Sequence, residues 1–170
     1  MDIDYTARVA GSPFVKLSTP MIWIAAAFGL LLALVVYRSW PAVKPRSVGL
    51  HGGQLSLCPK SPNCVCSLEI DTQHGIAPVK FSGSGDTEWT ALVEAIKGMP
   101  NALVISDGEE YFHAEFRSTV FRFVDDVELH RDRSNYVIHL RSASRTGHSD
   151  LGVNRQRLEQ ILSLSGLGGM

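Results

Sequence analysis

The sequence predicts an α+β protein, with an antiparallel four-stranded meander, helices packed on one face of it, and one transmembrane helix in front. Three observations predict this architecture. They are an uncharged apolar run near the N-terminus, a helical apolar repeat close to residue 90, and a period-two alternation of apolar residues between residues 102 and 140. At 170 residues the chain has room for one ordinary domain and an appendage, which excludes a large multidomain enzyme.

The apolar run lies between Lys16 and Arg38, and its 21 residues carry no charge. As a helix it would span about 30 Å, the thickness of the hydrocarbon core of a bilayer. Tyr37 and Trp40 lie at its end, where aromatic rings favour the membrane interface. We therefore expect a single-pass membrane anchor over residues 17–40. A cleaved signal peptide is the alternative, although no small-x-small cleavage site follows the run before Trp40.

Proline and glycine recur between the apolar run and residue 62, too often for a continuous helix or strand. This composition predicts a linker or a wrapped loop over residues 41–57. The globular domain is then expected over residues 58–165, between an N-terminal tail of residues 1–16 with its anchor and a flexible tail of residues 166–170.

Charge is nearly balanced, with 16 basic and 17 acidic side chains and a net charge of −1. Nonspecific binding of nucleic acid depends on an excess of positive charge, so we expect no nucleic-acid partner.

Two helices are expected in the domain. Asp86 or Thr87 would cap the first, and Gly98 would end it. Asp150 would cap the second, and Asn154 lies on the stripe of that helix that faces the sheet, where its amide needs buried partners. Apolar residues recur at the helical interval in the first helix: Trp89, Leu92, Val93 and Ile96.

Alternating apolar residues predict the four strands of the meander. The strands are expected over Ala102 to Ser106, Tyr111 to Arg117, Phe121 to Leu129 and Tyr136 to Leu140.

Cys58 and Cys64 lie in a proline-bounded segment whose turn-forming residues can bring the two sulfurs together. A disulfide there needs an oxidising compartment, which would put the globular domain in the periplasm or an equivalent space. Unpaired thiols are one alternative, because Cys66 makes the count odd. A zinc site with His74 is the other, but the spacing lacks paired Cys-x2-Cys knuckles, so we expect no metal ligand. Nothing in the sequence predicts a cofactor.

Alternation in the second strand turns His113 and Glu115 away from the apolar residues of that strand. With Asp126 they are the candidates for a hydrolase-like polar site, in which Arg145 would clamp an anion. A solvated sheet face with cross-strand ion pairs is the simpler interpretation. No Gly-x-Ser-x-Gly elbow or P-loop occurs, and we assign no catalytic residue.

Asp125 and Asp126 are adjacent in a strand, so their side chains point to opposite faces. Asp125 has the parity of the apolar residues and should point inward, where a carboxylate needs an arginine. We expect Arg141 or Arg145 to be that partner.

Residues 141–155 form the densest polar stretch, which leaves a strand and enters the start of a helix. Backbone N–H groups at a helix start and nearby basic side chains suit an anion. The alternative is that Asp150 caps the helix and the arginines pair with carboxylates of the domain. The residues expected to bind a small anionic ligand are Arg141, Arg145, His148, Asp150, Asn154 and Arg155.

Four motifs in order resemble the uncharacterised family named domain of unknown function 1499. They are Cys58 to Val65, Tyr111 to Glu115, Phe123 to Glu128 and Arg141 to Arg155. The resemblance covers nearly all of residues 55–163 and places Cys58 and Cys64 on the paired cysteines of the family, whereas Cys66 stands where a serine is expected. It implies a membrane or export segment before a compact domain, and no established reaction.

Together these features predict a membrane-anchored, noncatalytic accessory or binding domain, associated as a small subunit with a larger integral-membrane protein assembly. A small membrane-tethered enzyme that uses the His/Glu/Asp/Arg polar site is the alternative.

Overall fold

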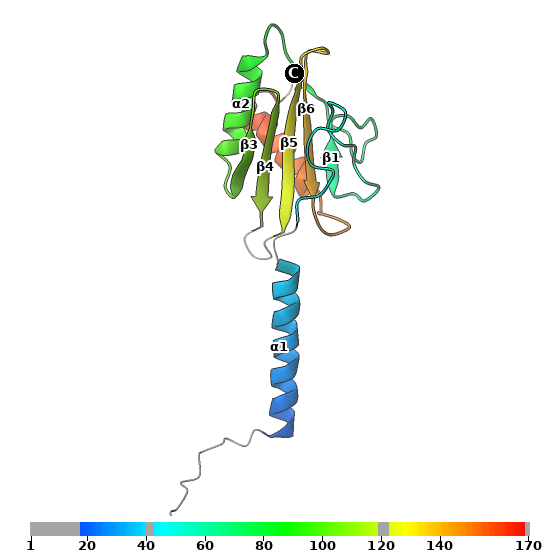
Figure 1. Cartoon of the computed structure of the whole chain (residues 1–170), viewed down its shortest axis with the longest axis vertical. Coiled ribbons are helices and arrows are strands. Elements are labelled where there is room, and N and C mark those ends of the chain that lie inside the picture. The colour runs from blue at the N-terminus through cyan, green and yellow to red at the C-terminus, as the bar shows by residue number, and fades with distance from the viewer. Residues whose placement is uncertain (1–17, 40–42, 119–122, 169–170) are drawn as a thin grey trace, which may run out of the picture. The chain divides into compact units, whose positions relative to one another are not determined.

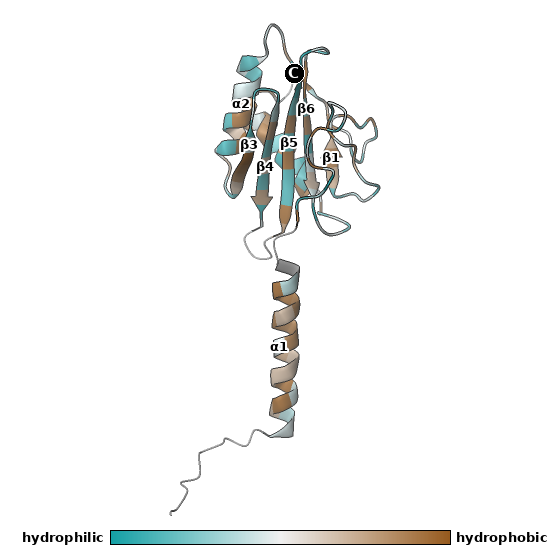
Figure 2. Cartoon of the chain, in the orientation of Figure 1, coloured by the Kyte–Doolittle hydropathy of each residue, from teal (hydrophilic) through white to brown (hydrophobic). Residues whose placement is uncertain are grey.

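The computed structural model describes residues 18–39, 43–118 and 123–168, and the chain divides into two compact units between Arg38 and Ser39. All of helix α1 (Thr19–Ser39) except its last residue belongs to the first unit, and all other elements belong to the second. Residues Thr19–Tyr37 are long and apolar enough to cross a membrane, and none of this span is buried. Figure 2 shows apolar residues along most of α1. The expected N-terminal tail of residues 1–16, and Trp40, lie outside the described residues.

The second unit is an α+β domain whose sheet contains the expected antiparallel meander (Figure 1). The sheet is wider than the predicted four strands, because two short strands also pair with β6. Segments of three and two residues are too short to show a period-two pattern, so the alternation did not reveal them. The meander consists of β3 (Ala102–Asp107), β4 (Tyr111–Arg117), β5 (Val124–Asp132) and β6 (Val137–Ser144), and the added strands are β1 (Cys64–Cys66) and β2 (Val79–Lys80).

Two strand boundaries differ from the sequence prediction. Strand β6 starts one residue late because Tyr136 has a φ of 56°, in the left-handed region, and it continues to Ser144, so that Arg141 lies within the strand. Strand β5 starts at Val124, and Phe121 lies outside the described residues.

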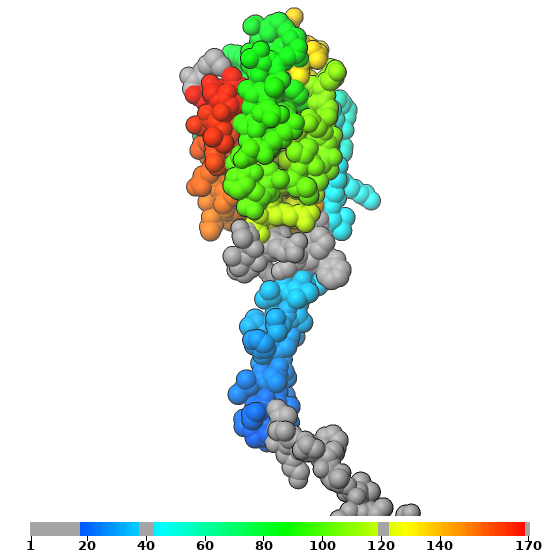
Figure 3. Space-filling model, turned by 90° about the vertical axis from the view of Figure 1, so that its left-hand side faces the viewer, coloured from blue at the N-terminus to red at the C-terminus, as the bar shows by residue number. Residues whose placement is uncertain are grey.

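Helices α2 (Asp86–Lys97) and α3 (Val153–Leu164) lie side by side on one face of the sheet (Figures 1 and 3). Their apolar faces pack on the sheet and bury the residues predicted from the helical interval. Burial of this apolar surface is the main force that holds the layers together. The core includes Trp89, Leu92, Ile96, Phe112, Val127, Leu129, Leu140, Leu158 and Ile161.

The predicted cap of α2 is wrong, because Gly85 occupies the N-cap and no side chain there caps the helix by a hydrogen bond. Gly85 has a φ of 72°, and a Cβ at this position would come within 2.5 Å of the Phe81 ring. Only glycine fits both conditions. Asp86 instead accepts hydrogen bonds from Ser84 and Arg131.

Residues 43–59, which we call the strap, lie over β5 and β6 on the face of the sheet opposite the helices (Figure 1). Val48 and Leu55 of the strap are buried. The backbone N–H of Gly49 donates a hydrogen bond of 2.7 Å to Oε1 of Glu128 in β5. This segment therefore packs on the domain rather than extending freely from it.

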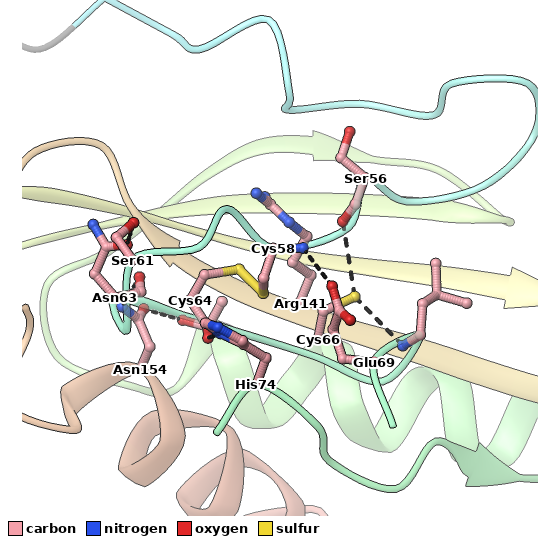
Figure 4. The surroundings of a disulfide bond; sticks show 12 residues. Ser56, Cys58, Ser61, Asn63, Cys64, Cys66, Glu69, His74, Arg141 and Asn154 are labelled. Carbon is pink, nitrogen blue, oxygen red and sulfur yellow. Dashed lines mark hydrogen bonds between the residues drawn. A yellow bond between two sulfur atoms is a disulfide. The ribbon is translucent and has the colours of Figure 1, made fainter. Parts of the chain in front are cut away.

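A disulfide joins Cys58 of the strap to Cys64 of β1, with their Cα atoms 5.6 Å apart (Figure 4). The predicted pairing is present, and Cys66 is the odd thiol. Cys66 is buried, its thiol donates to the carbonyl oxygen of Ser56, and burial raises the pKa of the thiol. The disulfide therefore fastens the end of the strap to the edge of the sheet.

Removal of the disulfide by Cys58→Ser with Cys64→Ser should lower the free energy of unfolding by about 2 kcal/mol, because closure of this short loop restricts the unfolded chain. Chemical denaturation of the full chain in detergent micelles measures the change. The control Cys66→Ala keeps the disulfide. When a reductant is added, the free energy of unfolding of this control should fall by a similar amount. Equal stability of the oxidised chain and the double variant would contradict the expectation.

Candidate functional site

Polar side chains occupy the middle of the sheet face that the strap covers. Alternation along β4 turns its apolar residues to the helices and turns His113 and Glu115 to the opposite face. Strand β5 does the same with Asp126 and Glu128, and the register sets Glu128 between His113 of β4 and Arg141 of β6. All five side chains are buried. The expectation of a solvated face is therefore wrong, because these side chains are buried, whereas the expected ion pairs are present.

Arg145, just after β6, is the centre of the first group of charges, which we call the Arg145 cluster. Its Nε and Nη2 donate to the two carboxylate oxygens of Asp126, at 2.8 and 2.7 Å, and Nη2 also donates to Glu115. Glu115 accepts a second hydrogen bond from Arg117, at 2.9 Å. Nε2 of His113 lies 2.7 Å from Oδ1 of Asp126. The candidate catalytic residues thus converge, and their charges are paired with one another.

Glu128 is the centre of a second group of polar contacts and is completely buried. Its Oε2 accepts a hydrogen bond of 2.7 Å from Nη1 of Arg141. Its Oε1 accepts hydrogen bonds of 2.7 Å from the hydroxyl of Tyr111 and from the backbone N–H of Gly49. A buried carboxylate is tolerated only when partners of this kind replace water.

The paired arginines keep the carboxylates of the Arg145 cluster ionised. Burial alone would raise the pKa of Asp126, but hydrogen bonds from Arg145 and His113 outweigh it and hold this pKa below its usual range. Burial acts on Glu115 in the same way, and hydrogen bonds from Arg117 and Arg145 again leave its pKa lowered. A general acid or base at neutral pH needs a pKa near 7, and these two carboxyl groups are shifted away from it.

Tyr111 is held in its protonated form. Burial, and then the negative charge of Glu128, raise the pKa of its hydroxyl above the usual range. The hydroxyl is therefore a fixed donor to Glu128.

A cavity of about 340 Å³ lies between the strap and the sheet. Of the three candidate catalytic residues, only Asp126 is part of its lining, whereas His113 and Glu115 are not. The cavity has an apolar side from the strap and a charged side from the sheet. Its lining includes Pro45, Val48, Leu57, Asp126, Arg141 and Arg145.

The six residues expected to hold an anion do not gather at one place. Arg141 and Arg145 lie on the strap side of the sheet. Arg155 donates to the backbone carbonyl oxygens of residues 72, 73 and 75, and His148 is exposed. The basic side chains therefore do not converge on the start of α3, where the sequence prediction placed the anion.

Asp150 and Asn154 form hydrogen bonds with other residues of the chain at the start of α3. The Asp150 carboxylate accepts hydrogen bonds from the backbone N–H groups of Gly152 and Asn154, although Gly152 occupies the N-cap. The buried amide of Asn154 has the internal partners that its position requires. Its Nδ2 donates to Asn63, Ser144 and Asp150, and its Oδ1 accepts from Ser142 and Arg157.

The expected partner of Asp125 is wrong. Asp125 pairs with Arg157 of α3, at 2.7 Å, rather than with Arg141 or Arg145. Its parity puts it on the helix side of the sheet, whereas both of those arginines lie on the strap side. Arg157 follows Asn154 by three residues, so the helical interval places it on the same stripe and could have indicated the pair.

Glu128 is a residue of the site that sequence reasoning missed. It shares the parity of Asp126 in β5, so the alternation alone could have placed it beside the named candidates. The same alternation in β4 places Tyr111 on the face of His113.

Cys58, Cys64, Cys66 and His74, the residues of the zinc alternative, have other partners. Two of the thiols form the disulfide, and Nδ1 of His74 donates to the carbonyl oxygen of Cys64, at 2.9 Å. Within the described ranges, no group of three or more His, Cys, Asp or Glu side chains is arranged to hold a metal ion.

Arg145→Met should lower the free energy of unfolding by about 3 to 5 kcal/mol at pH 7, because it leaves buried carboxylates without their shared partner. Because the folded-state pKa of Asp126 is lowered, its ionisation stabilises the fold above its usual pKa of 3.8, and this stabilisation is lost as pH falls through the lowered value. The difference between wild type and variant should therefore shrink below about pH 4. Urea denaturation between pH 7 and pH 3 measures it.

Arg133→Met is the matched control, because the Arg133–Glu110 pair is exposed. Its loss should cost less than about 1 kcal/mol. A destabilisation by Arg145→Met that stays constant over the whole pH range would contradict the role assigned to Asp126.

Comparison with known families supports the resemblance carried by the four motifs. The model of the family described as "Protein of unknown function (DUF1499)" matches residues 54–164. The match covers the sheet, both helices that pack on it, and the disulfide. Among curated proteins, none matches the chain. Because the family match covers more than half of the 170 residues, the chain belongs to the DUF1499 family of proteins of unknown function.

Proposed function

We propose that the chain is a membrane-anchored, noncatalytic binding domain that serves as a small accessory subunit of a larger integral-membrane protein assembly. In this proposal α1 crosses the bilayer once, and the domain faces the periplasm or an equivalent oxidising space. The observation that carries the proposal is that α1 exposes apolar side chains on all sides.

The character of α1 supports a lasting contact with lipid or with other membrane helices. Successive residues of an α-helix are rotated by about 100°, so Phe28 and Leu30 point about 200° apart. Both are more than half exposed. A helix that is apolar all round is covered either by a protein core or by a membrane, and the described span of α1 has no buried residue.

The disulfide supports the proposed compartment. Bonds such as Cys58–Cys64 form and persist in oxidising spaces and are rare in the cytosol. A domain held beside a bilayer also meets membrane-embedded partners at a raised effective concentration, which suits an accessory subunit.

The paired charges of the sheet face support a noncatalytic role. Asp126 and Glu115 share Arg145, and His113 contacts Asp126. A nucleophile or general base needs a lone pair that can reach the substrate. The two carboxylates are used in internal contacts, and the Nδ1 of His113, which has no partner among the described residues, is buried.

Recovery of the tagged full chain from its native membranes tests the proposal. Alkaline carbonate should leave the chain in the membrane pellet, and N-terminal sequencing of the mature protein should find the residues of α1. Mild detergent should release a complex that also contains a polytopic membrane protein.

A matched variant carries a cleavable export signal in place of residues 1–38. It should fold in the oxidising space, leave the membrane, and co-purify with at least tenfold less of the partner, because it loses the raised local concentration of about 10²-fold or more that tethering supplies. A mature form that begins after Trp40, or a full chain that always elutes alone, would overturn the proposal.

A further inference from the structure

We propose that the cavity beneath the strap binds a small organic acid, whose carboxylate lies on Arg141 and whose short apolar body lies against Pro45, Val48 and Leu57. This inference deepens the binding role proposed above and rests on it. It names a ligand class and a place in the domain, and it does not depend on the partner assembly.

Arg141 supplies the donors. The residue is 2% exposed and lines the cavity, yet its guanidinium makes a single hydrogen bond with the described residues, from Nη1 to Glu128. A guanidinium carries five N–H donors, and the Nε of Arg141 is buried without a partner among the described residues. Figure 4 shows the guanidinium extending toward Cys58 of the strap, which also lines the cavity. A buried cation with unused donors favours an oxygen acceptor.

The neighbouring carboxylates do not need these donors. Glu128 receives its remaining hydrogen bonds from Tyr111 and Gly49. Asp126, which shares the cavity wall, is bonded by Arg145 and His113. The Nη2 of Arg141 is therefore available to a ligand in the cavity, whereas its Nε is enclosed by the domain.

The charge of the surroundings favours one negative charge on the ligand. Three arginines and three carboxylates face one another on this side of the sheet, so their formal charges cancel. A carboxylate adds one negative charge beside this balanced set, whereas a phosphate monoester adds about −1.5 to −2 and meets more repulsion from Asp126 and Glu128. The six residues are Arg117, Arg141, Arg145, Glu115, Asp126 and Glu128.

The size and the strap side of the cavity favour a short apolar body. Its volume of about 340 Å³ is at the lower end of the range of about 300 to 1,000 Å³ that is usual for ligand pockets. Pro45, Val48 and Leu57 give the strap side an apolar surface. Leu57 is also largely exposed, so it lies where the cavity opens to solvent.

Isothermal titration of the full chain in lipid nanodiscs tests the inference, with empty nanodiscs as the blank. Hexanoate is the probe, and 1-hexanol and hexylamine are the uncharged and cationic probes of the same length. Hexanoate should bind at least tenfold more tightly than either of the other two, because its head group alone combines hydrogen-bond acceptors with a charge opposite to that of Arg141.

Leu57→Glu puts a carboxylate at the mouth of the cavity and should weaken hexanoate binding at least tenfold. Leu50→Glu is the matched control, because Leu50 is exposed on the same strap and is not part of the cavity lining. It should leave the affinity unchanged. Both variants change exposed side chains, so neither substitution should disrupt the folded core.

Arg141→Gln combined with Glu128→Gln removes both charges of the buried pair together, and should make hexanoate and 1-hexanol bind equally. The inference is overturned if hexanoate shows no binding with a Kd below about 1 mM, if Leu57→Glu and Leu50→Glu bind it equally, or if the double variant keeps the preference for the acid. These titrations use the chain without a partner. Failure to find an assembly would therefore count against the proposed function but not against ligand binding in the cavity.

Discussion

Burial of the Glu128 carboxylate is the constraint on which the arrangement of the domain depends. A carboxylate removed from water destabilises the fold unless each of its oxygens finds a donor. Its donors come from three different parts of the chain: Tyr111 in β4, Arg141 in β6 and the backbone of Gly49 in the strap. Gly49 has a φ of 119°, a conformation that residues with a side chain rarely adopt. The strap is therefore held on the sheet both by this contact and by the disulfide at its end.

The same constraint shapes what the sheet face can do. Charges buried on this face need opposite charges, and the Arg145 cluster meets this need with Asp126 and Glu115. Such pairing stabilises the ionised forms and leaves little capacity for proton transfer at neutral pH. Arg141 differs from Arg145, because among the described residues its guanidinium makes a single hydrogen bond to a carboxylate, from Nη1 to Glu128. In the function that we propose, this face binds a ligand and α1 tethers the domain to the membrane.

The sequence predicted the elements whose side chains follow a clear period. The α+β class, the four long strands, both helices of the domain and the Cys58–Cys64 pair are all present. Alternation also placed His113 and Glu115 correctly on the face away from the helices. It could not show that the strap covers this face, since an irregular segment has no period and its contact with Glu128 uses a backbone amide. For the same reason, the sequence could not distinguish a buried set of ion pairs from a solvated one. The partner of Asp125 could not be identified without knowing where α3 lies on the sheet.

Amide hydrogen exchange at Gly49, in the full chain with its disulfide intact, measures the contact between the strap and Glu128 most directly. If the strap seals the charged face, the Gly49 amide should exchange as slowly as the amides of the central strand β5, because both open only when the domain unfolds. An amide at Gly49 that exchanges at the rate of an unstructured peptide, while β5 stays protected, would contradict the seal and the buried pairing that depends on it.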